Sequence, residues 1–137
     1  MKIGGSSARA DGDGRAVHVN TELHGVGTTS FEVGVALGLV VNELLSNSHK
    51  HAIHAAGTLT IELSVSAVED ATGSDFYVDV KDDGPGLPDD FDPQTSDSLG
   101  MQIVQAIIAR HGGRMSVVDP ARAHLRVYLR DEKPKLE

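Results

Sequence analysis

The stretch Leu37–Ala52, LGLVVNELLSNSHKHA, decides the fold of this chain. It belongs to a longer run, over residues 31 to about 54, in which apolar residues recur at the three- and four-residue spacing of an amphipathic helix. The residues of this stripe are Val33, Leu37, Val40, Val41, Leu44, Leu45 and Ala52. Such a stripe must be buried against another layer, so we expect this helix to cover a sheet.

The same helix carries three polar side chains on one face. Glu43, Asn47 and Lys50 are spaced by four and three residues, which brings them to one side of a helix. An Asn oxygen is a suitable Mg²⁺ ligand, a Glu can orient or deprotonate an attacking group, and a Lys can reach a phosphate. Taken alone, the pattern is just as typical of a helix with a solvated polar stripe.

Strands are predicted on both sides of this helix. Alternating or β-branched runs occupy residues 15–20, 57–66, 76–80, 115–118 and 124–129. A second helix is expected over residues 99–111, ended by Gly112. The order of the elements predicts an α/β (α+β) two-layer sandwich, in which helices cover one face of a mixed, mostly antiparallel sheet.

Composition limits the domain organisation and the function. The chain has 137 residues, enough for one domain, which we expect over residues 15–130 between a flexible tail or linker (1–14) and a charged C-terminal tail (131–137). The absence of cysteine excludes disulfides and thiolate chemistry and fits a cytoplasmic location. The net charge of −8 argues against non-specific nucleic-acid binding. No run of about 20 apolar residues exists, so we expect no membrane contact from this segment.

The motif DDGPG, residues 82–86, follows the strand predicted at 76–80. Glycines at 84 and 86 permit positive φ and let a ligand approach the main chain. A carboxylate at Asp82 can accept a hydrogen bond from the exocyclic amine of adenine, whereas guanine presents a carbonyl at that position. An ordinary turn remains the alternative, because Asp-Gly and Pro-Gly are common turn dipeptides.

The motif SLGMQIV, residues 98–104, opens the second predicted helix. Gly100 lies at this predicted helix start, where free N–H groups can bind phosphate. The alternative is a helix that is simply capped by Ser98. Between this motif and the previous one, residues 87–98 contain two prolines and four aspartates and predict a surface loop.

In order and spacing, the three motifs resemble the N, G1 and G2 boxes of the GHKL (Bergerat) ATPase superfamily, and most closely its HisKA_2 or HWE-like histidine kinases. The resemblance covers residues 15–130 and implies binding of ATP with Mg²⁺. It implies that Asn47 is the Mg²⁺ ligand, Lys50 a catalytic phosphate contact, and Glu43 the residue at the general-base position. It implies that residues 87–98 form an ATP lid. The nucleotide contacts that it implies are Asn47, Lys50, His51, Asp82, Gly84, Gly86, Leu87, Ser98, Leu99, Gly100 and Met101.

Two departures from the family pattern affect the functional hypothesis. Ser98 stands where many G2 boxes have their first glycine, and no histidine lies in a segment that resembles a phosphoacceptor box. The resemblance therefore implies the catalytic domain of a sensor histidine kinase, which transfers the γ-phosphoryl to a histidine on a missing or partner dimerisation domain and works with a response regulator. A stand-alone anti-sigma-factor serine kinase, or a degenerate nucleotide-binding module that docks a response regulator, remains an alternative.

Overall fold

One sheet and two helices make up the part of the chain that the structure describes. The computed structural model describes residues 2–10, 16–51, 58–93 and 98–134. In chain order the elements are β1 (Lys2–Ala10), β2 (Ala16–His24), α1 (Phe31–His51), β3 (Leu59–Asp70), β4 (Gly73–Asp82), α2 (Leu99–Arg110), β5 (Arg114–Asp119), the 3₁₀ turn η1 (Pro120–Arg122) and β6 (His124–Glu132).

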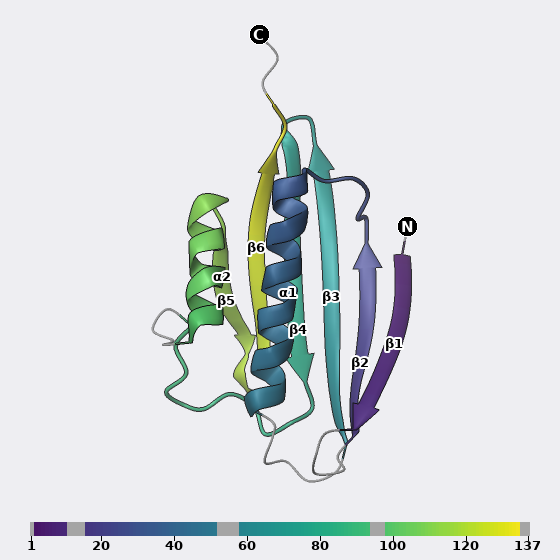
Figure 1. Ribbon diagram of the computed structural model, residues 1–137, viewed down its shortest axis with the longest axis vertical. Coiled ribbons are helices and arrows are strands. Elements are labelled where there is room, and N and C mark those ends of the chain that lie inside the picture. Colours follow the sequence, from purple (N-terminus) through teal and green to yellow (C-terminus); the bar gives the residue numbers. More distant parts are fainter. Residues whose placement is uncertain (1, 11–15, 52–57, 94–97, 135–137) are drawn as a thin grey trace.

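The sheet has six strands in the order β1-β2-β3-β4-β6-β5. Strands β2 and β3 run parallel, since α1 crosses over between them, and every other neighbouring pair is antiparallel. Both helices lie on the same face of the sheet (Figure 1). The predicted two-layer sandwich with a mixed, mostly antiparallel sheet is confirmed. No helix among the described residues is long and apolar enough to cross a bilayer.

Strand β1 corrects the expectation of a flexible tail over residues 1–14. Lys2–Ala10 pairs with β2 in an antiparallel ladder along its whole length. The segment is mostly Gly, Ser and Ala, so it lacks the alternation that predicts a strand, and its partner is the backbone edge of β2. At the other end, Asp131 and Glu132 belong to β6 and not to a tail. Residues 11–15 and 135–137 lie outside the described part, and the division into domains stays a prediction.

Strand β4 shows how a two-residue period positions a polar group. Val78 and Val80 are buried in the core with residues of both helices, and Phe76, two residues earlier, is buried on the same side of the strand. The same alternation continues for one more step and buries Asp82, the last residue of the strand, with only 3% of its surface exposed. A carboxylate thereby lies at the helix-covered face although an apolar residue would cost less there.

Helix α1 begins after a capping serine. The Ser30 hydroxyl accepts a hydrogen bond from the Val33 N–H at 3.2 Å, as expected for an N-cap. Asp131 at the end of β6 accepts hydrogen bonds from the N–H and hydroxyl of Ser30 and from the hydroxyl of Thr29. Burial raises the pKa of Asp131, but these hydrogen bonds outweigh it, so the net pKa is lowered. The start of α1 is thus hydrogen-bonded to the C-terminal end of β6.

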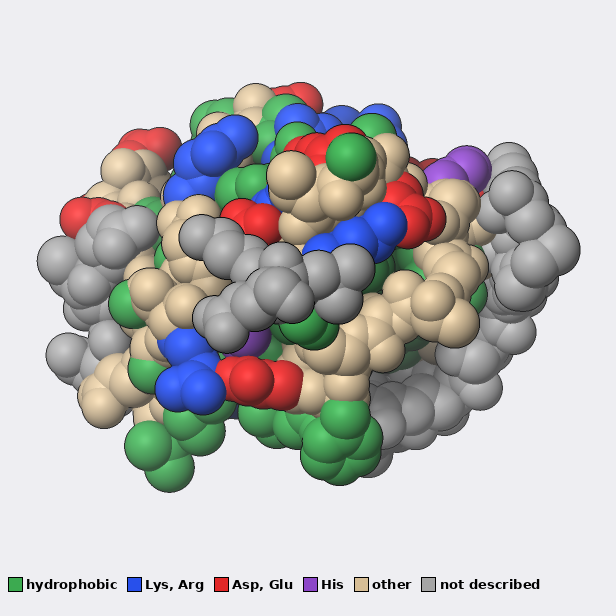
Figure 2. Space-filling view, turned by 90° about the horizontal axis from the view of Figure 1, so that it is seen from above, with side chains coloured by type: hydrophobic (Ala, Val, Ile, Leu, Met, Phe, Trp, Pro, Cys, Tyr) green, Lys and Arg blue, Asp and Glu red, His purple; other side chains and the backbone are tan. Residues whose placement is uncertain are grey.

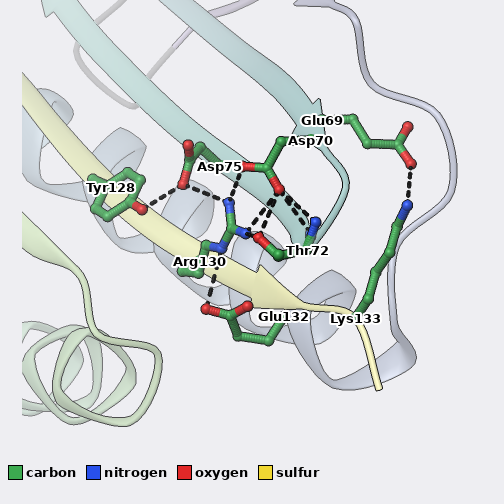
Figure 3. A network of polar contacts seen from close by, with 9 residues as sticks. Glu69, Asp70, Thr72, Asp75, Tyr128, Arg130, Glu132 and Lys133 are labelled. Carbon is green, nitrogen blue, oxygen red and sulfur yellow. Dashed lines mark hydrogen bonds and ion pairs between the residues drawn. The ribbon is translucent and has the colours of Figure 1, made fainter. Parts of the chain in front are cut away.

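Arg130 joins the β3–β4 turn to β6 (Figure 3). Its guanidinium donates to Asp70 at 3.1 Å, to Asp75 at 3.2 Å and to the Thr72 hydroxyl at 2.6 Å. The hydrogen bond from Arg130 is the main reason that the pKa of Asp70 lies well below its usual range. Tyr128 completes the network, because its hydroxyl donates to the Asp75 carboxylate. This network fixes the end of the sheet that lies opposite the predicted nucleotide site.

We expect Tyr128→Phe to lower the free energy of unfolding by about 1 kcal/mol at pH 7, because one hydrogen bond to a carboxylate is lost. That hydrogen bond raises the pKa of Tyr128 to about 12, so the folded state favours the neutral phenol. The stabilisation is complete below the ordinary tyrosine pKa of about 10 and is lost as the pH rises through about 12. Urea unfolding of both proteins between pH 7 and pH 11 measures the difference.

Tyr77→Phe is the matched control. The Tyr77 ring packs against the Tyr128 ring with centroids 5.2 Å apart, and its hydroxyl makes no hydrogen bond with the described residues. We expect this variant to have the stability of the unmodified protein at every pH in the series. A loss of stability in Tyr128→Phe that does not shrink at high pH would contradict the assigned role of the Asp75 contact.

Candidate functional site

The three sequence motifs come together at one end of the molecule. Figure 1 shows the C-terminal half of α1, the end of β4 and the start of α2 at the same end. The Glu43 side chain on α1 reaches α2, where the Ser98 hydroxyl lies 3.5 Å from Glu43 Oε1. The Glu43 carboxylate also lies directly against Gly100, because a Cβ built on Gly100 would stand 1.8 Å from Glu43 Oε2. Residues of the first and third motifs are therefore in contact although at least 55 positions separate them in the sequence.

Asp82 is held at the same end by local hydrogen bonds. Its Oδ1 accepts from the Gly84 N–H at 2.9 Å. The next residue, Asp83, is exposed and has a different role, since its carboxylate accepts from the Thr60 N–H at 2.8 Å and its own N–H donates to the Thr60 carbonyl at 3.2 Å. The two neighbouring aspartates thus have different roles. Asp82 is buried beneath the helices, whereas Asp83 is exposed and its hydrogen bonds hold the start of β3 against the end of β4.

Gly86 has a structural role that the sequence did not indicate. Its φ is +87°, and an added Cβ would lie 2.9 Å from the Pro120 carbonyl oxygen and 3.0 Å from that of Ala121. The Leu87 N–H donates to the same Pro120 oxygen at 2.9 Å. Glycine is therefore required at 86 by the close approach of η1. Contacts of Gly84, Gly86 and Leu87 with a nucleotide stay a prediction.

The polar face of α1 is only partly accessible. Glu43 and Asn47 are half-buried, and Lys50 is exposed. His51 is the last residue of α1, and its side chain lies outside what the structure describes. Ser48, which the sequence reasoning overlooked, is buried to 7% exposure on the core side, four residues after Leu44 in the apolar stripe.

The start of α2 combines a cap with a glycine. The Ser98 hydroxyl accepts from the Met101 N–H at 3.1 Å, and its carbonyl accepts from the Gln102 N–H at 3.0 Å. The Met101 side chain is buried in the core, whereas Leu99 is 73% exposed. Met101 can therefore contribute only its backbone to a ligand at this end, while Leu99 is accessible. The expected helix end at Gly112 is confirmed, with φ +59° and the Gly113 N–H bonded to the Ile108 carbonyl.

The predicted lid is partly anchored. Leu87 and Phe91 pack against the hydrophobic core, and the Phe91 N–H donates to the Pro88 carbonyl at 3.0 Å. Gln105 on α2 donates to the Pro93 carbonyl at 2.8 Å. Residues 94–97 lie outside the described part of the chain. Closure of this segment over a ligand stays a prediction.

A cleft of about 670 Å³ lies at the opposite end of the molecule, between the start of α1, the end of α2 and the end of β6. Figure 2 looks onto this end and shows, around the atoms drawn in grey, acidic, basic and hydrophobic side chains intermixed. Its charged groups pair with one another: Glu32 with Arg110, and Arg130 with Glu132 at 3.3 Å. The hydrogen bond from Arg110 is the main reason that the pKa of Glu32 is lowered. These charged groups of the cleft are therefore already paired within the protein.

Comparisons with known proteins identify the family of the chain. The family described as histidine kinase-, DNA gyrase B-, and HSP90-like ATPase matches residues 32–133. The chain is 32% identical over 106 residues to blue-light-activated histidine kinase 2 of Erythrobacter litoralis, an alignment that covers 77% of this chain and 30% of the relative. It is also 32% identical over 117 residues to the sensor histidine kinase PdtaS of Mycobacterium tuberculosis, with 85% of this chain and 23% of the relative covered.

Among solved structures, the blue-light activated histidine kinase EL346 of Erythrobacter litoralis superposes with a TM-score of 0.67 at 27% identity, over 82% of this chain and 34% of that one. The histidine kinase domain of the same protein gives a TM-score of 0.64 at 26% identity, over 82% of this chain and 53% of that domain. The chain spans less than a third of the length of these curated relatives.

Proposed function

The chain belongs to the histidine kinase-, DNA gyrase B-, and HSP90-like ATPase family, and from this premise we propose that it binds Mg-ATP where α1, β4 and α2 meet. The observation that carries the proposal is the contact of Glu43 with Gly100, which joins the first and third motifs at the end of the molecule where β4 ends in Asp82. The donor set at this end fits the ligand. It includes the buried Asp82 carboxylate for the adenine base, the half-buried Asn47 amide for Mg²⁺ and the start of α2 for the phosphates.

Asp82 is proposed to select adenine. Its carboxylate can accept a hydrogen bond only, so it suits the exocyclic amine of adenine and rejects the carbonyl that guanine presents there. Burial makes the selection stronger, because an unmatched pair of acceptors inside the protein has no water to solvate it. The Gly84 N–H keeps the carboxylate oriented by holding Oδ1.

Asn47, Lys50 and the start of α2 are proposed to hold the metal and the phosphates. The Asn47 amide oxygen would bind Mg²⁺, whose other positions phosphate oxygens and waters would fill. Lys50 is exposed at the end of α1 and would approach the phosphates as a point charge, and the N–H groups near Gly100 would receive phosphate oxygens. In an acidic chain these groups are needed to offset repulsion between the protein and the nucleotide.

The reaction that we propose is phosphoryl transfer from ATP to a histidine on a separate dimerisation domain, which then passes the signal to a response regulator. A nitrogen of the imidazole would bond to the γ-phosphorus as the bond to the bridging oxygen breaks, which releases ADP and the imidazole proton. The chain's own residues would align the phosphates and neutralise their charge, which is how most phosphoryl-transfer sites work. Glu43 is proposed as the group that orients the attacking nitrogen or accepts its proton.

Two measurements test the proposal. Calorimetric titration with ATP, with Mg²⁺ or with a chelator, should give Mg²⁺-dependent binding. No binding in either condition would instead favour a degenerate module that only docks a partner. Incubation of the chain, labelled ATP and the dimerisation domain of a related histidine kinase should then give a phosphorylated product that is labile in acid and stable in base. An acid-stable product formed on a Ser-bearing antagonist would instead identify a serine kinase.

A further inference from the structure

The start of α2 already has an anionic neighbour, which comes from α1. A Cβ built on Gly100 would stand 1.8 Å from Oε2, 2.3 Å from Cδ and 2.7 Å from Oε1 of Glu43. The carboxylate therefore fills the space that a side chain at position 100 would need. Gly100 lies within α2 and has no positive φ, so the contact that a side chain there would meet is with the Glu43 carboxylate and not with backbone.

This arrangement is electrostatically favourable in the absence of a ligand. A helix start carries a partial positive charge and N–H groups that lack partners within the helix. The first turn of α2 contains no acidic residue of its own, so Glu43 supplies the negative charge from the neighbouring helix. The Ser98 hydroxyl, 3.5 Å from Glu43 Oε1, caps the Met101 N–H at the same time and links the two helices.

We propose that Glu43 is a gate for nucleotide phosphates: its carboxylate occupies the start of α2 when no nucleotide is bound and must leave when a phosphate group arrives. This inference rests on the proposed ATP site and adds a coupling that the site alone does not require. Two anions cannot share one helix start without strong repulsion, so part of the binding free energy of the phosphates is used to displace Glu43. The displaced carboxylate then becomes available to the attacking group only when a nucleotide is present.

The gate predicts opposite effects of one substitution on two measurements. Glu43→Gln keeps the shape of the side chain and removes its charge. We expect the nucleotide-free protein to unfold at a lower urea concentration, because α2 loses its anion, and the affinity for Mg-ATP to rise by about five- to tenfold, because nothing charged has to be displaced. If Glu43 only stabilised the fold, its replacement would lower the stability without raising the affinity for Mg-ATP.

Glu32→Gln is the matched control, because it removes the same charge from the same helix at the other end of α2, where Glu32 pairs with Arg110. We expect its affinity for Mg-ATP to change by less than about twofold. If Glu43→Gln does not fold, Glu43→Asp tests the same point, since its carboxylate is one methylene shorter and cannot reach Gly100 as closely. Glu43→Gln and Glu43→Asp should each bind Mg-ATP more tightly than the unmodified chain.

The possible outcomes separate this inference from the proposed function. If the unmodified chain binds Mg-ATP and Glu43→Gln binds with equal or lower affinity, the gate is wrong and the nucleotide site stands. If the unmodified chain does not bind Mg-ATP, the proposed function itself is wrong. Tighter binding in Glu43→Gln, with no change in Glu32→Gln and a lower stability without nucleotide, supports the gate.

Discussion

Replacing Asp82 by Asn is expected to lower the affinity for ATP about a hundredfold while the domain stays folded. The two side chains have the same shape, and the amide oxygen of Asn can still accept the hydrogen bond from the Gly84 N–H. The amide NH₂ of Asn would then replace the second carboxylate oxygen, Oδ2, and face the amine of adenine, so two hydrogen-bond donors would oppose each other at a buried position. A loss of about 2–3 kcal/mol corresponds to that factor.

Calorimetry with Mg-ATP measures this loss, and circular dichroism with urea unfolding verifies the fold. The same titration with Mg-GTP is informative, because the amide of the variant can donate to the guanine carbonyl. We therefore expect the preference for ATP over GTP to shrink or to reverse.

Asp83→Asn provides a matched control for Asp82→Asn. It removes one negative charge from the adjacent residue. Asp83 is exposed, and its carboxylate accepts a hydrogen bond from the Thr60 N–H, which the amide oxygen of Asn can also accept. We expect its ATP affinity to stay within about twofold of the unmodified chain. Equal ATP affinity in Asp82→Asn and Asp83→Asn would contradict the assignment of Asp82 to the base.

Replacing Asn47 by Ala is expected to remove the dependence of ATP binding on Mg²⁺ and to slow phosphoryl transfer at least about a hundredfold. Alanine has no oxygen to bind the metal, and the metal both positions the phosphates and neutralises their charge. The fold should tolerate the change, since Ala is favoured in helices and Asn47 is only half-buried. The initial rate of phosphohistidine formation and the ATP affinity with and without a chelator measure the effect.

Asn42→Ala is the control, because it makes the same substitution on the same helix at an exposed position. We expect it to transfer phosphate at the rate of the unmodified chain within about twofold. The role of Asn47 as metal ligand would be refuted if Asn47→Ala retained Mg²⁺-dependent transfer.

Local patterns were sufficient for most of the architecture. The apolar stripe of α1 predicted a long helix, and its buried members Val33, Val40 and Leu44 do face the sheet. The alternation in β4 also determined that Asp82 lies on the side that Phe76 and Val80 bury. Both outcomes depend only on the period of a helix or a strand, which is a property of neighbouring residues.

Other parts of the structure depend on partners that are distant in sequence. Strand β1 has too few apolar residues to be recognised, and it exists because its backbone pairs with the edge of β2. The need for glycine at 86 comes from the approach of η1, more than thirty residues later. No local period carries information about such an approach.

The amino-acid sequence by itself determined the elements from β2 onward, their order and the three motifs that predict a nucleotide site, because helix and strand periods and motif spacing are local. Only the tertiary structure decided that the Glu43 carboxylate lies against Gly100 and that Arg130 donates hydrogen bonds to both Asp70 and Asp75 beside the β3–β4 turn. The physical reason is that these contacts follow from strand order, register and helix packing, which bring together groups whose positions along the chain are unrelated.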